Sequence, residues 1–217
     1  MKVTQTNKNP IAQISEKERP PAPQSLELKE VKRLKNVALI RFAEYQGIPE
    51  LLAKSYFREL RIYNHEKNKS FLALGMKNES GGYYFCTKFL ESYVRKEDIS
   101  FIRGTKEIQE KVHLFLHRKD FLSWLRIKGK VKHEDDAIVL HSLRFLKEAP
   151  PLIQNYTYKT VYTWFPNRKA GDKATNYLAS FCGTQNELRH SCMRHQYKEH
   201  KDLNHFLVSK LGLRGNE

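Results

Sequence analysis

Short apolar runs alternate with stretches of helical spacing in the second half of the sequence, and this alternation limits the possible folds. The apolar runs lie at residues 112–116, 137–140 and 160–165. Such alternation is typical of a mainly parallel sheet whose connecting helices cover its faces. With 217 residues, 40% of them hydrophobic, the chain is long enough to bury a substantial core. We therefore predict an α/β domain over residues 107–217.

One stretch, residues 160–175, contains a strand, a turn and the start of a helix in immediate succession. Pro166 and Asn167 have turn chemistry, and Gly171 lets the chain turn into a helix expected from Asp172 to about Phe181. In open α/β sheets, ligands bind beyond the carboxyl ends of the strands. We therefore expect the functional edge of the domain directly after residue 165.

The first half of the chain has a different pattern. Residues 1–24 are polar, basic and proline-containing, which predicts a disordered basic tail. Residues 25–106 predict a helical hairpin followed by a small antiparallel β-sheet. Its first helix is expected from a cap at Ser25 to Phe42, and its second from Pro49. The strands of the sheet are expected at residues 60–63, 70–75 and 83–87, with an edge strand at 99–102.

The other elements of residues 107–217 follow from the same kind of spacing. A helical stretch from Ser142 is expected to break at Pro150 and Pro151, because proline does not fit a helix interior. The remaining expected elements are helices at 119–128 and 202–211 and a strand at 188–195.

The chain is strongly basic, with 39 Lys and Arg against 24 Asp and Glu and a formal charge of +15. Such an excess favours a polyanionic partner, nucleic acid first and an anionic membrane second, although solubility alone can also explain it. Three sparse cysteines are typical of a reducing cytosol rather than a disulfide framework. No signal peptide is visible, and no apolar run approaches the ~20 residues that span a bilayer. We expect a soluble cytoplasmic protein with no membrane partner.

The order of these motifs resembles a Toprim domain, and in particular the primase-type Toprim proteins carried by mobile elements of Bacteroidetes. The resemblance covers roughly residues 34–212, and the order and spacing of its motifs carry it. The matching segments are residues 41–57, 71–83, 114–125, 169–171 and 198–207. The resemblance implies a mainly parallel Toprim-like sheet flanked by helices. It also implies that the helical hairpin and the small antiparallel sheet form the primase-like part that precedes it.

The sequence departs from this family at the residues that carry its chemistry. Toprim enzymes hold Mg²⁺ with a glutamate after the first strand and an Asp-x-Asp after the third. Here the glutamate position is Leu116, followed by His117 in place of glycine, and the two aspartate positions are Pro166 and Arg168. The zinc module of the family, with its clustered Cys and His, is also expected to be absent. The resemblance therefore implies a degenerate site with no catalytic residues, no metal and no cofactor.

Basic residues are the remaining indication of a function at this edge. Two pairs, Arg118 with Lys119 and Arg168 with Lys169, follow the first and third strands, so they are expected to converge. Lys and Arg can contact phosphates without Mg²⁺. The predicted nucleic-acid-binding residues are Arg118, Lys119, Arg168, Lys169, Arg194, Lys198 and Lys201, and the candidates for stacking on bases are Tyr83, Tyr84 and Tyr197.

Two metal alternatives stay open. A divergent primase or nuclease would need relocated carboxylates, and a zinc site would need Cys and His that approach one another despite loose spacing. The carboxylate candidates are Asp120, Glu134, Asp135, Asp136 and Asp172, and the zinc candidates are Cys182, His190, Cys192, His195 and His200.

The first hypothesis is therefore a non-catalytic nucleic-acid-binding accessory protein or subunit of a replication, mobile-element or defence complex, binding DNA or RNA. The second is the divergent metal-dependent enzyme. The third is a protein-interaction subunit with an acidic partner.

Overall fold

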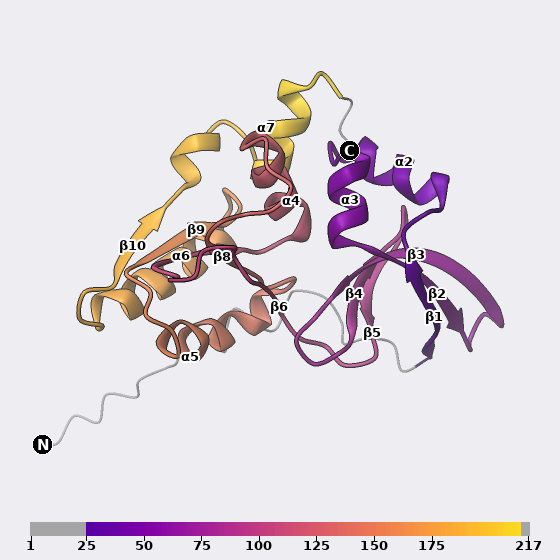
Figure 1. The fold of residues 1–217 in the computed structure, drawn as a ribbon, viewed down its shortest axis with the longest axis horizontal. Helices are drawn as coiled ribbons and strands as arrows, with labels where there is room; N and C mark the ends of the chain where they lie inside the picture. The colour runs from indigo at the N-terminus through magenta and orange to yellow at the C-terminus, as the bar shows by residue number, and fades with distance from the viewer. Residues whose placement is uncertain (1–24, 214–217) are drawn as a thin grey trace, which may run out of the picture.

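The computed structural model describes residues 25–213, which form two sheets joined by a helical layer (Figure 1). The first is a five-stranded antiparallel sheet in the order β1-β2-β3-β4-β5, and the second is a five-stranded sheet in the order β10-β9-β7-β8-β6. In Figure 1 the antiparallel sheet lies on the right and the second sheet on the left. The predicted tail, residues 1–24, lies outside the described residues. In the described part, no helix is both long and apolar enough to cross a membrane.

The first sheet and its helices occupy residues 26–94. Its strands are β1 (Leu26–Arg33), β2 (Arg58–Asn64), β3 (Lys69–Lys77), β4 (Tyr83–Cys86) and β5 (Glu91–Val94), and its helices are α2 (Val37–Tyr45) and α3 (Glu50–Tyr56).

The helix expected from Ser25 to Phe42 is wrong in its first half, because residues 26–33 form strand β1 and pair antiparallel with β2. The register shifts between Leu28 and Glu30, as in a β-bulge. The extra residue interrupts the two-residue alternation of a strand, so the apolar residues Leu28 and Val31 stand three apart and imitate helical spacing. Helix α2 begins only after Asn36, whose side chain accepts a hydrogen bond from the Leu39 amide.

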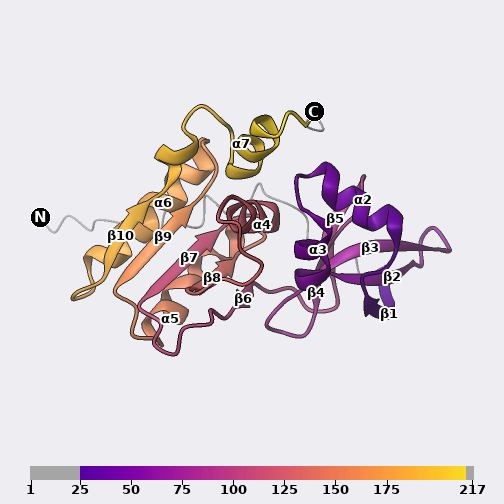
Figure 2. The same ribbon diagram turned by 45° about the horizontal axis from the view of Figure 1, so that its top comes forward.

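The predicted hairpin of two helices is present as α2 and α3, which pack together around Gly47 at φ +76°. Their apolar side chains, including Ala43, Ile48 and Ala53, share one core with Phe121 and Leu125 of the second half. The hairpin therefore belongs to the core that joins the two sheets (Figure 2).

The second sheet is parallel except at one edge. Strands β7, β8, β9 and β10 run parallel, and β6 pairs antiparallel with β8. The strands are β6 (Ser100–Ile102), β7 (Lys111–Phe115), β8 (Asp136–Val139), β9 (Thr160–Trp164) and β10 (Arg189–Cys192). The α-helices are α4 (Arg118–Ile127), α5 (Ala149–Gln154), α6 (Lys169–Gly183) and α7 (Leu203–Lys210), with short 3₁₀ helices η1 (Leu143–Glu148) and η2 (Arg194–Tyr197).

Helices cover both faces of this sheet. Apolar residues of η1, α5 and α6 pack on one face in a core that includes Leu114, Ile138 and Val161. Helix α4 covers the other face, where Phe115 and Trp164 lie, and the start of α7 and the hairpin extend the same core beyond α4. This arrangement confirms the predicted α/β fold, with a mainly parallel sheet flanked by helices and a small antiparallel sheet before it.

Two further predictions need correction. The edge strand at 99–102 was assigned to the antiparallel sheet, but β6 pairs with β8 of the second sheet, and β5 supplies the edge of the first. Pro150 and Pro151 do not break a helix, because they occupy the first turn of α5, where proline costs no hydrogen bond.

Candidate nucleic-acid interface

The carboxyl ends of β7 and β9 lie side by side, as predicted, because Phe115 pairs with Trp164 in the parallel register. Leu116 directly follows β7, Pro166 is the second residue after β9, and both side chains are buried. Leu116 is 0% exposed and packs in the core under α5 and α6. Two of the three positions at which the resemblance would place carboxylates are therefore apolar and closed to solvent, and the third, Arg168, is exposed.

The turn after β9 is held by close backbone packing. A Cβ atom added at Gly171 would lie 2.0 Å from the Pro166 carbonyl oxygen, so only glycine fits where α6 passes the turn. The Asn167 amide donates to the carbonyl of Lys201, and its side chain donates to the carbonyls of Tyr197 and His200 at 2.9 and 2.8 Å. Asn167 thus fixes the segment 197–201 to the end of β9. The local pattern predicts only a turn at Asn167 and gives no sign of these long-range hydrogen bonds.

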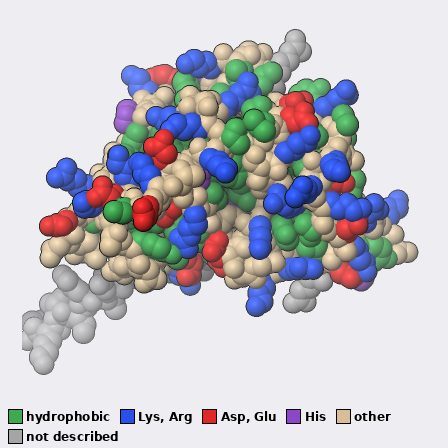
Figure 3. All heavy atoms as spheres, viewed as in Figure 1, with side chains coloured by type: hydrophobic (Ala, Val, Ile, Leu, Met, Phe, Trp, Pro, Cys, Tyr) green, Lys and Arg blue, Asp and Glu red, His purple; other side chains and the backbone are tan. Residues whose placement is uncertain are grey.

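Several predicted cations lie on the solvent side of this turn. Arg168 and Lys169 are exposed where α6 begins, and Lys198 is exposed on the segment that Asn167 holds. Arg194 is half-buried and paired with Asp172 of α6. A shallow pocket of about 460 Å³ brings together Arg168, Arg194 and Lys198 with Asn167, Asp172, Cys192 and His195. On the face drawn in Figure 3, Lys and Arg side chains spread over both halves of the molecule.

The prediction for Arg118 is wrong. Its side chain turns into the protein, where the residue is 1% exposed, and its Nη2 donates to Glu91 Oε1 of β5 at 2.9 Å. Its guanidinium also lies 5.5 Å from the centre of the Tyr84 ring. Arg118 ties α4 to the antiparallel sheet and is too deeply buried to contact a phosphate.

Lys119 and Lys201 open into a different hollow of about 300 Å³, which lies between α2, the loop after β4 and α7. Two acidic residues, Glu91 and Asp202, line the same hollow. Lys119 Nζ lies 3.5 Å from the Asp202 carboxylate, so part of its charge is compensated within the chain.

The tyrosines proposed for stacking on bases are not available. Tyr84 and Tyr197 are both 1% exposed. Tyr84 stacks on His141, and the Tyr197 hydroxyl donates to the Phe165 carbonyl at 3.0 Å. Tyr83 is half-buried and packs against the core of the antiparallel sheet. In each case the aromatic ring packs within the fold, an ordinary role for a tyrosine.

The candidate relocated carboxylates lie at opposite edges of the sheet. Glu134, Asp135 and Asp136 stand at the amino end of β8, and Asp136 accepts hydrogen bonds from the Tyr158 hydroxyl and the Gly104 amide. Asp120 and Asp172, on α4 and α6, lie toward the carboxyl ends of the parallel strands. No common ion can bridge these two sets.

Asp120 is wholly buried between α4 and α7. Its Oδ1 accepts a hydrogen bond from the Asn204 amide at 2.9 Å, while its Oδ2 has no hydrogen-bond partner among residues 25–213. Burial, and secondly the negative charge of Asp202, raise the pKa of Asp120 well above its ordinary value. A carboxyl in this setting favours the protonated form and is a poor ligand for Mg²⁺.

The Mg²⁺ that the fold resemblance implies does not fit these residues. Within residues 25–213, no three His, Cys, Asp or Glu side chains come together as a metal site. Leu116 and Pro166 offer no ligand, and Arg168 would repel a cation. The zinc candidates are also spread apart. Cys182 is buried in α6, where burial raises its pKa to about 11, whereas His200 pairs with His205.

Comparison with known proteins gives little by sequence. No curated protein matches the chain. Residues 28–95 match the model of a family described as a domain of unknown function, DUF8464. This region contains β1, the hairpin and β2 to β5, and none of the parallel sheet.

Comparison by structure is more informative. The crystal structure of the primase fragment of the bacteriophage T7 primase-helicase protein matches with a TM-score of 0.54 and 13% identity, covering 90% of this chain and 79% of that one. A second match, with a TM-score of 0.50 and 12% identity, covers 86% of this chain and 94% of the other. It comes from bacteriophage T7 lagging-strand DNA polymerase interacting with primase domains bound to an RNA/DNA hybrid and dTTP. At this identity the likeness concerns the fold. Together with the sheet order, it shows that the chain has a primase-like Toprim fold.

Proposed function

We propose that this chain is a non-catalytic, Toprim-like nucleic-acid-binding protein, acting as an accessory factor or subunit of a replication, mobile-element or defence complex in the cytoplasm. One observation carries the proposal. Buried Leu116 and Pro166 occupy the metal-ligand positions, while exposed Arg168, Lys169 and Lys198 stand just outside the same strand ends. The edge where a Toprim enzyme would hold a cation instead presents cations of its own.

Phosphate is the ligand that suits this edge. Lys and Arg bind phosphate oxygens by charge-assisted hydrogen bonds and release the counterions of the nucleic acid. Helix α6 begins at Lys169, and its partial positive end adds to the same field. The related fold in the T7 complex is described as bound to an RNA/DNA hybrid, which supports a nucleic-acid partner for this one. Binding through phosphates implies modest sequence preference.

A salt titration of binding to labelled single-stranded and double-stranded DNA and RNA tests the proposal. We expect affinity to fall steeply with salt, and the double variant Arg168→Glu, Lys169→Glu to bind about tenfold more weakly with a shallower salt slope. The double variant Lys128→Glu, Lys147→Glu, at exposed residues away from this edge, makes the same charge change and should show a smaller loss. Absence of binding at low salt would reject the proposal. An equal loss in both variants would remove this edge from the interface.

The catalytic alternative has its own test. The chain is incubated with labelled nucleic acid, nucleotides and Mg²⁺ or Mn²⁺, and products of synthesis or cleavage are measured. We expect none, because the carboxylates are divided between the two edges of the sheet. A metal-dependent product that disappears in Asp120→Ala would replace our proposal with the divergent enzyme.

A further inference from the structure

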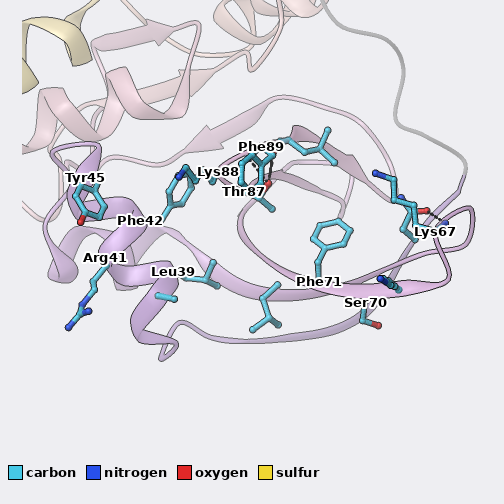
Figure 4. Close-up of a pocket in the computed structure, with 15 residues that line it drawn as sticks. Leu39, Arg41, Phe42, Tyr45, Lys67, Ser70, Phe71, Thr87, Lys88 and Phe89 are labelled. Carbon is cyan, nitrogen blue, oxygen red and sulfur yellow. Dashed lines mark hydrogen bonds between the residues drawn. The ribbon is translucent and has the colours of Figure 1, made fainter. Parts of the chain in front are cut away.

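A large hollow of about 980 Å³ lies on the antiparallel half of the molecule. Helix α2, the first residues of β3, the turn before it and the loop between β4 and β5 line it (Figure 4). We call it the α2–β3 groove. None of its lining residues belongs to the pocket around Arg168, although it shares Phe42, Tyr45 and the loop 87–90 with the hollow that contains Lys119.

Apolar and aromatic side chains form most of the groove. Leu39, Phe42, Phe71 and Leu72 come from α2 and β3, and the loop adds Phe89 and Leu90. Phe89 is 90% exposed. A contiguous patch of exposed large apolar side chains on a folded protein usually marks a binding surface.

The loop that carries Phe89 has a defined conformation. The Thr87 hydroxyl oxygen accepts hydrogen bonds from the Phe89 amide at 3.2 Å and the Leu90 amide at 2.9 Å. The Thr87 amide in turn donates to the Leu90 carbonyl at 2.8 Å. These bonds already order the loop in the free protein. Binding a partner through Phe89 therefore costs little conformational entropy.

Four cations line the groove, and no acidic residue does. The cations are Arg41, Lys67, Lys69 and Lys88. Across residues 25–213, none of these four side chains makes an ion pair. By contrast, many surface lysines elsewhere, such as Lys54 and Lys159, are paired with glutamates. The groove therefore combines an apolar floor with uncompensated positive charge.

This combination selects among possible occupants. A second copy of the chain carries a charge of +15 and is repelled. Residues 1–24 also lack the required chemistry, because they contain four Lys and Arg against two Glu and no aromatic residue. A nucleobase would bury its polar edges against Leu39, Leu72 and Leu90, where few groups can pair with them.

We propose that the α2–β3 groove binds an acidic peptide segment of a partner protein, with bulky apolar side chains in the groove and carboxylates against Arg41, Lys67, Lys69 and Lys88. Apolar anchors in a central pocket carry most of the affinity in such contacts. The surrounding charges set the partner and the rate of encounter. The groove shares no lining residue with the pocket around Arg168, so a protein partner and a nucleic acid can bind at the two surfaces together.

Selection from a displayed library of random short peptides on the full chain tests the proposal, followed by fluorescence anisotropy with the enriched peptides. We expect enriched sequences that combine Asp or Glu with Phe, Trp, Leu or Ile. Phe89→Ser should weaken their binding by about tenfold or more, as expected for an aromatic anchor. The double variant Lys69→Glu, Lys88→Glu should weaken it about as much and remove its salt dependence.

Matched variants keep the result specific. Ile108→Ser and Lys147→Glu change an exposed apolar and an exposed basic residue outside the groove, and both should leave peptide affinity unchanged. Phe89→Ser should also leave nucleic-acid affinity unchanged. Enrichment of basic or purely polar peptides, or equal peptide binding by Phe89→Ser, would overturn the proposal. So would oligothymidylate that competes with the peptides and loses affinity in Phe89→Ser, because the groove would then be a nucleic-acid site.

Discussion

The strand-end edge of the parallel sheet and the α2–β3 groove of the antiparallel half both carry basic residues. They differ in the exposure of their apolar side chains and in the acidic residues that lie near their cations. At the edge, apolar side chains are buried, and Arg194 and Lys198 each lie near an acidic neighbour. In the groove, Tyr45, Phe89 and Leu90 remain exposed, and the four cations have no acidic neighbour among the lining residues. Net charge alone therefore does not locate a binding surface, because burial and neighbouring acidic residues determine which cations are free to bind a ligand.

The largest effect is expected where the edge is most tightly packed. Gly171→Ala should lower the free energy of unfolding by about 3 kcal/mol, because the new methyl group collides with the Pro166 carbonyl oxygen. Gly183→Ala in the same helix is the control, since nothing lies within 4 Å of its Cβ position. It should be neutral or stabilising by up to about 1 kcal/mol. Urea denaturation measures both, and equal stabilities would show that the turn at Pro166 shifts to accommodate the added methyl group.

A smaller loss is expected at the junction between the two halves. Arg118→Met should cost about 2 kcal/mol, less than a fully buried pair, because Glu91 keeps partial contact with water. Nucleic-acid affinity, measured in the same salt titration, should not change. If the variant keeps its stability but loses nucleic-acid affinity, Arg118 contacts the nucleic acid, and its assignment as a structural residue is wrong.

The smallest effect concerns Asp120 and depends on pH. Because the folded-state pKa is raised, the folded chain holds this proton more tightly than the unfolded chain, so stability is greatest at low pH. It is lost as pH rises from the ordinary carboxyl pKa of 3.8 through the folded-state value. Asp120→Asn removes that loss while keeping an oxygen acceptor for the Asn204 amide.

Thermal denaturation at mildly acidic and mildly alkaline pH tests this expectation. The variant should gain stability over the natural chain as pH rises, by about 1 kcal/mol at the alkaline end. A parallel pH dependence of Asp120→Asn and the natural chain would mean that Asp120 is ionised in the folded state, and would reopen the question of a metal ligand.

Much of the second half could be predicted from the sequence, because its elements have clear local signals. The apolar runs at β7, β8 and β9 and the turn at Pro166 and Asn167 mark strands and their ends without reference to the rest of the chain. Strand β1 could not be predicted in the same way, since its bulge gives Leu28 and Val31 the spacing of a helix. Pairing with β2, a long-range interaction, decides its conformation.

The candidate site could be predicted only in part. The replacement of carboxylates at Leu116, Pro166 and Arg168 follows from the order of motifs, as does the approach of the strand ends. The inward turn of Arg118 does not, because Arg118 and Lys119 are adjacent in sequence and differ only in which side of α4 faces the antiparallel sheet. The α2–β3 groove joins α2, β3 and a loop whose residues are scattered over positions 38–90, and no local pattern indicates that they meet.

The α/β class, the basic excess and the replacement of the carboxylates at Leu116, Pro166 and Arg168 can be read from the sequence alone, because each depends on residue type and local periodicity. By contrast, the tertiary structure determines which cations reach solvent, which cations are paired and where apolar side chains remain exposed. Those outcomes depend on burial and on neighbours distant in the chain, and the packing of α2, α4 and α7 between the two sheets sets them.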